Sequence, residues 1–409
     1  MTAFDAHLAE AARRDDADPL RHLRDRFALP AGVVYLDGNS LGPLPKSTAA
    51  AMADAVTVQW GDDLIGGWTR HGWIDLPRRV GGQIAGLLGV GPDEVLVVDS
   101  VSVNLFKVLT ALVRNSGSRR VILTEAGNFP TDLHVAEGVA DVTGCRVVAV
   151  GREELVSRID EQTAVVLLTH VHYRTAERFD IHAIQRAAGD VPVVWDLSHS
   201  VGAVPLRLAD EGARYAVGCG YKYLNGGPGA PGFVHIARDR QNAMRPALQG
   251  WMGDARPFDF RDDYRPAAGI DRFRVGTPPV LSTLALAEGV ATFGGVDMDA
   301  AWRKSQALFD LLVSLMAEYA ADFRLITPTA ASRRGSHASF AHENAWPINN
   351  ALIARGVIGD FRTPDVLRLG LTPLYTRFVD IVTAVERLAA ILASGEWQAA
   401  RFQERREVT

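Results

Sequence analysis

The sequence predicts an α/β protein whose large domain contains a mostly parallel, seven-stranded sheet and whose smaller domain is α+β. Three observations carry this prediction. Seven short, valine-rich runs in the middle of the chain are apolar at nearly every position, as expected of strands with both faces buried. Helical patterns separate these runs, and such alternation is typical of a parallel sheet covered by helices on both faces. From about residue 281 onward, helical patterns dominate.

The predicted elements follow one another in a regular order. A charged, helical segment covers about residues 2–27. The strands are expected at 95–98, 121–124, 146–150, 165–169, 191–195, 215–218 and 232–236. The helices between them are expected at 103–113, 132–142 and 181–188. The C-terminal part is expected to hold helices at 281–293, 300–319, 345–355 and 379–392, with strand-like pieces at 323–326 and 366–370.

This order predicts two domains. Residues 46–290 are expected to form the large domain that binds the ligand, and residues 1–45 together with 291–409 the smaller one. Residues 250–276 show no clear periodicity, so we expect a long ordered loop there. Ordered loops of this length often carry function.

Composition excludes several classes of protein. The 409 residues are 47% hydrophobic and 22% charged, unlike a disordered or fibrous chain. The net charge of −5 offers no basic surplus for a phosphate backbone, so we expect no nucleic-acid partner. The longest apolar runs fall far short of the ~20 residues that span a bilayer, and the acidic start lacks the apolar core of a signal peptide. With only two cysteines, the chain is expected to be cytoplasmic, without membrane contact.

Residues just after each strand are the first candidates for function, because ligands of such sheets bind at the carboxyl ends of the strands. Ser100 and Ser102 lie where the first strand meets a helix. A helix N-terminus with nearby hydroxyls binds phosphate well, although a serine there can simply cap the helix. Phe129 and Asp132 follow the second strand, where a flat ligand could stack, although Asp132 can equally cap the next helix.

Two further strand ends carry polar residues. His170 and His172 follow the fourth strand, but a metal would need a third ligand, so we expect no metal site. Asp196 directly follows the fully apolar fifth strand, where a carboxylate is costly unless a cation meets it. A local hydrogen bond between Asp196 and His199 is the simple alternative.

Lysines are rare in this chain, which narrows the search for a nucleophilic amine. Only four of the 43 basic residues are lysines. Lys222 lies between two tyrosines in a glycine-rich turn after an apolar strand, where little room is left for water. Desolvation disfavours the ammonium form and so favours a nucleophile, whereas the alternative is a solvated loop lysine. Lys46, Lys107 and Lys304 are expected in exposed helical contexts.

The spacing of Asp196 and Lys222 suggests that they act together. The spacing of 26 positions from Asp196 to Lys222 corresponds to one helix and one strand, which would place both at nearby strand ends. An acid opposite a ring nitrogen, a lysine on an aldehyde and a helix N-terminus on a phosphate are what pyridoxal phosphate requires. The residues therefore point to this cofactor.

Eight stretches carry a resemblance to a known family. They are YLDGNSLGPLP (35–45), SVNLFK (102–107), NFPTD (128–132), WDLSHSVGAVPL (195–206), GCGYKYLNGGPG (218–229), QGWMG (249–253), GTPPVLS (276–282) and LRLGLTPLYTRF (367–378). On these stretches, which span nearly the whole chain, the sequence resembles the kynureninase family of type I, aspartate-aminotransferase-like pyridoxal-phosphate enzymes. The aspartate and lysine alone mark only the wider group, whereas GNSLGP, GYKYLNGGPG and LGLTPLYTRF together are specific to kynureninases.

The resemblance implies roles for individual residues. Lys222 matches the Schiff-base lysine, Asp196 the partner of the pyridinium nitrogen, and Tyr221 a phosphate ligand and catalytic proton donor. The other implied cofactor-binding residues are Val101, Ser102, Phe129, Asp132, Thr169, His199, Trp251 and Thr277. Arg368 matches the clamp on the substrate α-carboxylate, and Trp68 a position against the substrate's aromatic ring.

The implied activity is hydrolysis of the Cβ–Cγ bond of L-kynurenine to anthranilate and L-alanine, in tryptophan degradation and the route toward NAD. The hydroxylated substrate, 3-hydroxy-L-kynurenine, would give 3-hydroxyanthranilate. The resemblance also implies a homodimer in which the loop at 250–276 reaches the phosphate of the neighbouring subunit.

Rival interpretations fit the residues less well. A cysteine desulfurase of the same fold needs a mobile cysteine, whereas Cys145 and Cys219 are expected on strands. A non-catalytic protein on this fold would be expected to lack the lysine, the aspartate or the arginine. A nicotinamide enzyme is disfavoured because no G-x-G-x-x-G follows the first strand.

Three positions depart from the family's pattern. His172 and Ala176 stand where asparagine and glycine are expected, and Val101 stands where many relatives carry a hydroxyl residue. We expect these changes to affect substrate preference or cofactor affinity and to leave the chemistry intact.

Overall fold

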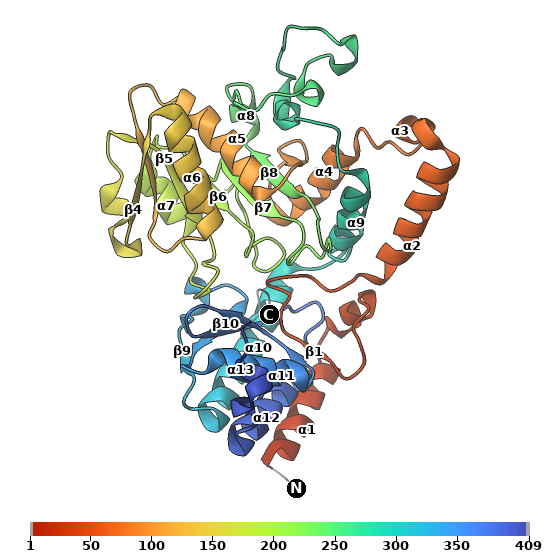
Figure 1. Ribbon diagram of the computed structural model, residues 1–409, viewed down its shortest axis with the longest axis vertical. Coiled ribbons are helices and arrows are strands. Elements are labelled where there is room, and N and C mark those ends of the chain that lie inside the picture. The colour runs from red at the N-terminus through yellow and green to blue at the C-terminus, as the bar shows by residue number, and fades with distance from the viewer. Residues whose placement is uncertain (1–2, 406–409) are drawn as a thin grey trace.

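The seven apolar runs form one sheet in the computed structural model, which describes residues 3–405 (Figure 1). The strand order is β2, β8, β7, β6, β5, β3, β4. The strands are β2 (Val95–Val97), β3 (Val121–Glu125), β4 (Arg146–Val150), β5 (Thr163–Thr169), β6 (Val193–Asp196), β7 (Tyr215–Cys219) and β8 (Gly232–Ile236). Within this sheet β8 alone runs antiparallel to its neighbours, so the prediction of a mostly parallel sheet is confirmed.

Strand β5 shows why these sequences form buried strands. Val165 and Leu167 pack into an apolar core on one side of the sheet, and Val166 and Leu168 into a core on the other side. All four are 0% exposed. The helices on the first side are α5 (Val101–Arg114) and α6 (Pro130–Thr143), and those on the second are α4 (Leu76–Leu88), α7 (Ile181–Ala188) and α9 (Val280–Ala291). Helices therefore cover both faces, as continuous apolar strands require.

Parallel pairing brings the ends of neighbouring strands level. Thr169 at the end of β5 is paired with Asp196 at the end of β6, and Asp196 with Val217 on β7. Because parallel strands end at the same edge, the turns after β5, β6 and β7 meet there with the start of α5. This edge holds the candidate site.

A second unit, below the large sheet in Figure 1, has its own apolar core. Its antiparallel sheet is ordered β12, β13, β10, β9. The strands are β9 (Arg324–Leu325), β10 (His337–Ala341), β12 (Asp360–Arg362) and β13 (Val366–Gly370). The helices around it are α1 (Ala3–Asp16), α10 (Met298–Tyr319), α11 (Ala345–Ala354), α12 (Phe378–Ser394) and α13 (Ala400–Gln403). Of these strands, the sequence pattern predicted β13 and the region of β9.

The N-terminal segment is tied to both units. Strand β1 (Val34–Tyr35) pairs in parallel with β11 (Val357–Ile358), next to the second unit. Leu23 and Phe27, expected in the small domain, pack in a core of the large sheet instead. The division into 46–290 and the remainder stays a prediction. Residues 1–2 and 406–409 of the predicted small domain lie outside the described part.

Two segments project from the large unit. One is an arm made of α2 (Lys46–Asp54), the π-helix η2 (Ala55–Asp62), η3 (Leu64–Gly66) and α3 (Gly67–Arg70), at the right of Figure 1. The other is the loop at 250–276, which contains only the short turns η6 (Trp251–Gly253), η7 (Pro257–Asp259) and η8 (Gly269–Phe273), as predicted for an ordered loop. The arm was not predicted. Across residues 3–405, no helix combines the length and apolar character that a membrane crossing needs.

Lys46, Lys107 and Lys304 were predicted to be exposed, and this prediction is wrong for Lys107 and Lys304. Lys107 on α5 is 0% exposed and donates to Asp99 Oδ2 at 2.6 Å and to the Phe273 carbonyl at 2.7 Å. Lys304 on α10 is also buried, with its Nζ 2.7 Å from Asp18 Oδ2. A buried ammonium requires such partners, and helical periodicity does not reveal carboxylates that come from distant segments.

We expect Lys107→Met to lower the free energy of unfolding by about 3 kcal/mol, because it leaves Asp99 without its cation. Urea unfolding followed by circular dichroism measures this change. The control is Lys46→Met, at the exposed first residue of α2, which should shift the value by less than about 0.5 kcal/mol. Equal midpoints for the two variants would show that the buried pair does not stabilise the fold.

Candidate functional site

A cavity of about 140 Å³ lies at the edge where β5, β6 and β7 end and α5 begins. Eight of the predicted site residues line it: Val101, Ser102, Phe129, Thr169, Asp196, His199, Tyr221 and Lys222. They come from five separate segments of the chain. Parallel pairing and the glycine-rich turn after β7 bring these segments together.

Asp196 ends β6 and is buried at one side of the cavity. Its Oδ1 accepts hydrogen bonds from the Ser198 backbone N at 2.8 Å and the Ser198 hydroxyl at 2.6 Å. The expected alternative, a hydrogen bond to His199, is wrong. Burial raises the pKa of Asp196, although the bonds from Ser198 work in the other direction. Because Ser198 satisfies Oδ1, the second oxygen, Oδ2, is left for a cation in the cavity.

Asp132 lies behind Thr169 in the first turn of α6 and is 0% exposed. The Thr169 hydroxyl lies 2.5 Å from Asn128 Oδ1 and 3.0 Å from Asp132 Oδ2. A hydroxyl carries one proton, so both bonds form only when the Asp132 carboxyl is itself protonated. Burial and the charge of Asp196 both raise the pKa of Asp132, in agreement with this. Asn128, which orders this network, was not singled out from the sequence.

Lys222 points into the cavity from the turn after β7. Its Nζ lies 3.4 Å from His199 Nε2 and 5.7 Å from the centre of the Phe129 ring. Burial lowers the pKa of Lys222. Burial also lowers the pKa of His199 well below its usual range, and the nearby charge of Lys222 lowers it further. A neutral imidazole beside an amine of low basicity is an arrangement suited to nucleophilic chemistry.

Glycines compress the turn that carries Lys222. A Cβ atom on Gly220 would lie 2.5 Å from the Pro231 carbonyl oxygen, and one on Gly226 would lie 2.7 Å from the Gly220 carbonyl oxygen. Neither distance is compatible with a side chain. The close backbone packing that the sequence predicted around Lys222 is therefore present, and Lys222 lines the cavity instead of extending into solvent.

The start of α5 forms a second wall of the cavity. Ser100 caps this helix, since its Oγ accepts from the Val103 backbone N at 3.4 Å, and the helix begins at Val101. The first N–H groups of a helix have no partner within it and attract anions. A Cβ atom on Gly232 would lie only 3.2 Å from the Val101 backbone N. Glycine at this position thus keeps the helix N-terminus open to a phosphate-sized anion.

Arg368 lies on β13 of the second unit and is 1% exposed. Its Nε donates to Asp360 Oδ1 at 2.7 Å, and its other bonds go to Asp360 Oδ2, the Ser40 hydroxyl and the Tyr173 carbonyl. Its charge contributes to the low pKa of Lys222 and of His199, after burial. Sequence reasoning missed Asp360, although a buried arginine on an apolar strand requires a carboxylate nearby.

Five predicted residues do not line the cavity of their own chain, namely Asp132 and Arg368, described above, and Trp68, Trp251 and Thr277. Trp68 lies on the arm, where its ring meets Trp73 edge-on at 5.7 Å. Trp251 is 41% exposed and stacks on Phe260 with ring centres 6.3 Å apart, and Thr277 is exposed. The roles implied for these residues stay predictions.

The departures from the family's pattern have visible local consequences. Ala176 has φ +60°, a conformation that favours glycine. His172 Nε2 lies 2.9 Å from the Gly127 carbonyl oxygen, while its Nδ1 meets the backbone N of Arg174 and of Thr175 at 3.3 Å. The imidazole therefore organises this turn through hydrogen bonds to the backbone.

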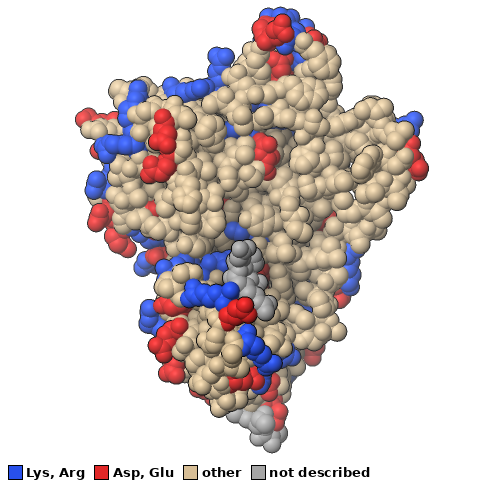
Figure 2. Space-filling model, in the orientation of Figure 1, with Lys and Arg blue, Asp and Glu red and all other residues tan. Residues whose placement is uncertain are grey.

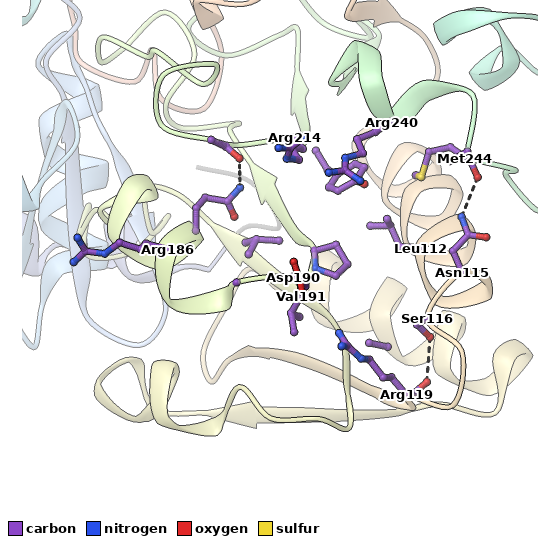
Figure 3. Close-up of a pocket in the computed structure, with 18 of the residues that line it drawn as sticks. Leu112, Asn115, Ser116, Arg119, Arg186, Asp190, Val191, Arg214, Arg240 and Met244 are labelled. Atoms are coloured by element: carbon purple, nitrogen blue, oxygen red, sulfur yellow. Dashed lines mark hydrogen bonds between the residues drawn. The ribbon is translucent and has the colours of Figure 1, made fainter.

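A larger hollow, of about 870 Å³, lies at the opposite edge of the large sheet (Figure 3). Arg119, Arg214 and Arg240 line it together with Asp190 and other residues, and none of the predicted site residues does. The residues that line this hollow carry charges of both signs, and neither a lysine nor a cysteine is among them. The chemistry of the smaller cavity identifies that cavity as the candidate site.

Comparisons with known proteins show what the whole chain is similar to. Residues 302–388 match the family model described as Kynureninase C-terminal domain. A kynureninase of Burkholderia mallei (strain SAVP1) is 45% identical over 419 aligned residues, which cover 98% of this chain and 99% of that protein. A kynureninase of Deinococcus radiodurans is 47% identical over 395 residues, which cover 94% of this chain and 96% of that protein.

Solved structures show the same fold at lower identity. An apo cysteine desulfurase from Thermococcus onnurineus NA1 has a TM-score of 0.77 at 16% identity and covers 91% of this chain and 98% of its own. A complex between the cystine C-S lyase C-DES and its product, cysteine persulfide, has a TM-score of 0.73 at 18% identity, covering 88% of this chain and 98% of its own. At these identities the likeness shows the fold alone.

We expect Lys222 to react with acetic anhydride at lower pH than an ordinary lysine when the protein is freed of bound small molecules. A lowered pKa means that the reactive free amine persists to lower pH. The acetylation rate plotted against pH should therefore have its midpoint below pH 10.5. Mass spectrometry measures this rate at each pH, as the acetylated fraction of the peptide that contains residue 222. A reference peptide with an ordinary lysine is acetylated in the same tube for comparison. A midpoint at or above that of the reference would contradict the burial argument.

Proposed function

The chain belongs to the kynureninase family, and on this premise we propose that it hydrolyses the Cβ–Cγ bond of L-kynurenine to anthranilate and L-alanine, with pyridoxal 5′-phosphate as cofactor. The same reaction takes 3-hydroxy-L-kynurenine to 3-hydroxyanthranilate. The observation that carries this function is the cavity in which Lys222, Asp196 and the N-terminus of α5 meet. The reaction belongs to tryptophan degradation.

Three features of the cavity fit this cofactor. Lys222 has a lowered pKa and can attack an aldehyde. Asp196 keeps one carboxylate oxygen free of hydrogen bonds from Ser198, and the N–H of a pyridinium ring would meet it. Gly232 leaves the first N–H groups of α5 open to a phosphate. The residues present therefore suit each of the three polar parts of the molecule.

The remaining lining residues complete the binding site in this proposal. Phe129 supplies an aromatic face beside Lys222, and Ser102 and Tyr221 supply hydroxyls near the phosphate. When bound, pyridoxal phosphate supplies an electron sink for bonds at the substrate's Cα. Asp196, as an anion, would strengthen that property by holding a proton on the ring nitrogen.

The chain's own residues handle the protons of the reaction. Lys222, as a free amine of lowered pKa, could take the proton from the substrate's Cα. His199, neutral and 3.4 Å away, can accept a hydrogen bond from it without adding charge. Burial raises the pKa of Tyr221, so its hydroxyl keeps its proton and can donate it at the β-carbon. Tyr221 is 36% exposed, so this side of the cavity is open to solvent.

A cysteine desulfurase is not favoured by this site. Cys219 is 3% exposed at the end of β7, with its Sγ 3.9 Å from the Ser198 carbonyl oxygen, and burial raises its pKa. A persulfide-forming cysteine has to move and to ionise. Cys145 lies at the start of β4, away from the cavity. Both cysteines are free, as in a reducing compartment, and we place the enzyme in the cytoplasm.

We also propose that the enzyme is a homodimer whose sites contain residues of both chains. Trp68, Trp251 and Thr277 all lie outside their own cavity, although the family pattern assigns them to the site. The arm and the 250–276 loop expose large apolar side chains, with Ile65 82% and Phe260 78% exposed. The face over α9 and the arm also carries few charged residues in Figure 2. Surfaces of this kind are typical of protein interfaces.

We expect Lys222→Ala to abolish both anthranilate production from kynurenine and the visible absorption of the bound cofactor, because no other described lysine lines the cavity. The wild-type protein with pyridoxal phosphate should show both, as measured by product fluorescence and absorption spectroscopy. Lys46→Ala is the control and should retain both. A wild-type protein that binds the cofactor without turning over kynurenine would overturn the proposed substrate.

Mixing two inactive variants tests the shared site. One variant is Lys222→Ala, and the other combines Trp251→Ala with Thr277→Ala. After joint refolding, mixed dimers should contain one intact site and restore about a quarter of wild-type activity at equal mixing. If tagged mixed dimers are isolated and remain inactive, each chain supplies its own contacts at these positions.

A further inference from the structure

The resemblance assigns the substrate's α-carboxylate to Arg368 alone, yet this guanidinium has already committed most of its hydrogen bonds. An arginine has five N–H donors. Arg368 directs Nε and Nη2 to the two oxygens of Asp360, Nη2 also to the Ser40 hydroxyl, and Nη1 to the Tyr173 carbonyl. One N–H remains. A planar carboxylate is best held by two parallel N–H groups, so Arg368 by itself cannot form that clamp.

A second arginine lies on the same network. Arg362 belongs to β12, and its Nη2 is 2.9 Å from the Asp360 Oδ2 that also binds Arg368. Its Nη1 donates to the Phe361 carbonyl at 2.8 Å, and its Nη2 also reaches the Ser40 hydroxyl at 3.3 Å. These bonds leave Nε and one hydrogen of Nη1 uncommitted. Arg362 is 34% exposed, whereas Arg368 is 1% exposed, so Arg362 is the more accessible of the two.

The register of the small sheet explains this arrangement. Strand β12 runs antiparallel to β13, and Asp360 is paired directly with Arg368. Arg362, two residues further along β12, projects from the same face of the sheet as Asp360. That face is turned toward the cavity, because His337 projects from the same face of β10, where Ser339 is paired with Arg368, and its ring centre lies 5.6 Å from that of the lining residue His199.

The charges of the network match a ligand with one negative charge. Asp360 is 0% exposed, and although burial works against ionisation, the two arginines hold its pKa below the usual range, so it is an anion. Asp37 is the other carboxyl beside this network, and burial together with the charge of Asp360 raises its pKa. When Asp37 is protonated, the two guanidinium groups and the one carboxylate of Asp360 leave one positive charge. An isolated cationic charge in a buried site calls for an anion.

We propose that Arg362 and Arg368, bridged by Asp360, form a two-arginine clamp for the substrate's α-carboxylate, with Arg362 supplying the N–H groups that Arg368 has given to protein acceptors. The inference rests on the proposed function, because it takes kynurenine as the substrate. Asp360 is then a positioning residue, since it fixes both guanidinium planes without touching the ligand. Ser40 assists it by donating to Asp360 Oδ2 at 2.5 Å.

The experiment compares Arg362→Gln with the control Arg355→Gln in the enzyme loaded with pyridoxal phosphate. Arg355 is a matched control, because it also forms a two-bond pair with a carboxylate, Glu396, at 2.7 and 2.9 Å, on the far side of the small unit. Arg362→Gln should raise the KM for kynurenine by about tenfold or more with kcat nearly unchanged, since a charge-assisted bond to the carboxylate is lost. Arg355→Gln should leave both constants near wild type.

A second readout isolates the carboxylate from any general effect on folding. The decarboxylated amine of kynurenine keeps the amine and the aromatic ketone but lacks the carboxylate. Wild type should bind kynurenine much more tightly than this amine, as followed by the change in cofactor absorption. In Arg362→Gln the preference should shrink by about tenfold. Arg362→Lys keeps the charge and loses the planar fork, so its preference for kynurenine over the amine should lie between those of wild type and Arg362→Gln. This variant also provides the test if the glutamine variant does not fold.

Two results would overturn the inference. One is an Arg362→Gln enzyme with wild-type KM, and the other is an unchanged preference for kynurenine over the amine in both Arg362 variants. Either would leave Arg368 as the sole carboxylate contact. A wild-type protein without kynurenine turnover would instead overturn the proposed function, so the two failures are distinguishable.

Discussion

The structure depends on one constraint, which is the cost of burying charge at the edge of a sheet that is apolar on both faces. The parallel register of β5, β6 and β7 leaves no polar face inside the large unit, so its charged groups gather where the strands end. There, burial raises the pKa of Asp132 and of Asp196 and lowers that of Lys222. A buried charged group costs less free energy when a ligand supplies its missing partner. An aromatic aldehyde with a ring nitrogen would supply partners for two of these groups, Lys222 and Asp196.

The second unit meets the same constraint in a different way. Its buried Arg368 is neutralised within the protein by Asp360, and Arg362 shares that carboxylate. These residues belong to β12 and β13 while Lys222 belongs to the large unit, so the proposed clamp would be complete only with the two units held together. The β1–β11 pair and Ser40 join the N-terminal segment to this network. With the proposed clamp, substrate recognition and the packing of the two units would depend on the same residues.

Much of this arrangement could be predicted from the sequence, for physical reasons that also explain the failures. Strands buried on both faces are short apolar runs, so β4 and β8 were located to the residue. The carboxyl-end rule then found Asp196 and Lys222. One of the two partners of Lys107, the Phe273 carbonyl, could not be found, because it is 166 residues away and meets the lysine only through tertiary packing. Asp360 was missed for a related reason, since antiparallel pairing opposite Arg368 is invisible to local periodicity. Trp68 and Trp251 lie outside the lining of their own chain's cavity, and local sequence patterns do not reveal this placement.

The central claim is that Lys222 and Asp196 hold pyridoxal phosphate from opposite sides in the cavity at the strand ends. A crystal structure of the protein grown with this cofactor tests it most directly. Continuous electron density should run from Lys222 Nζ to the cofactor, with the ring nitrogen beside Asp196 and the phosphate at the start of α5. A cofactor joined to a different residue, or one whose ring nitrogen lies away from Asp196, would contradict the account.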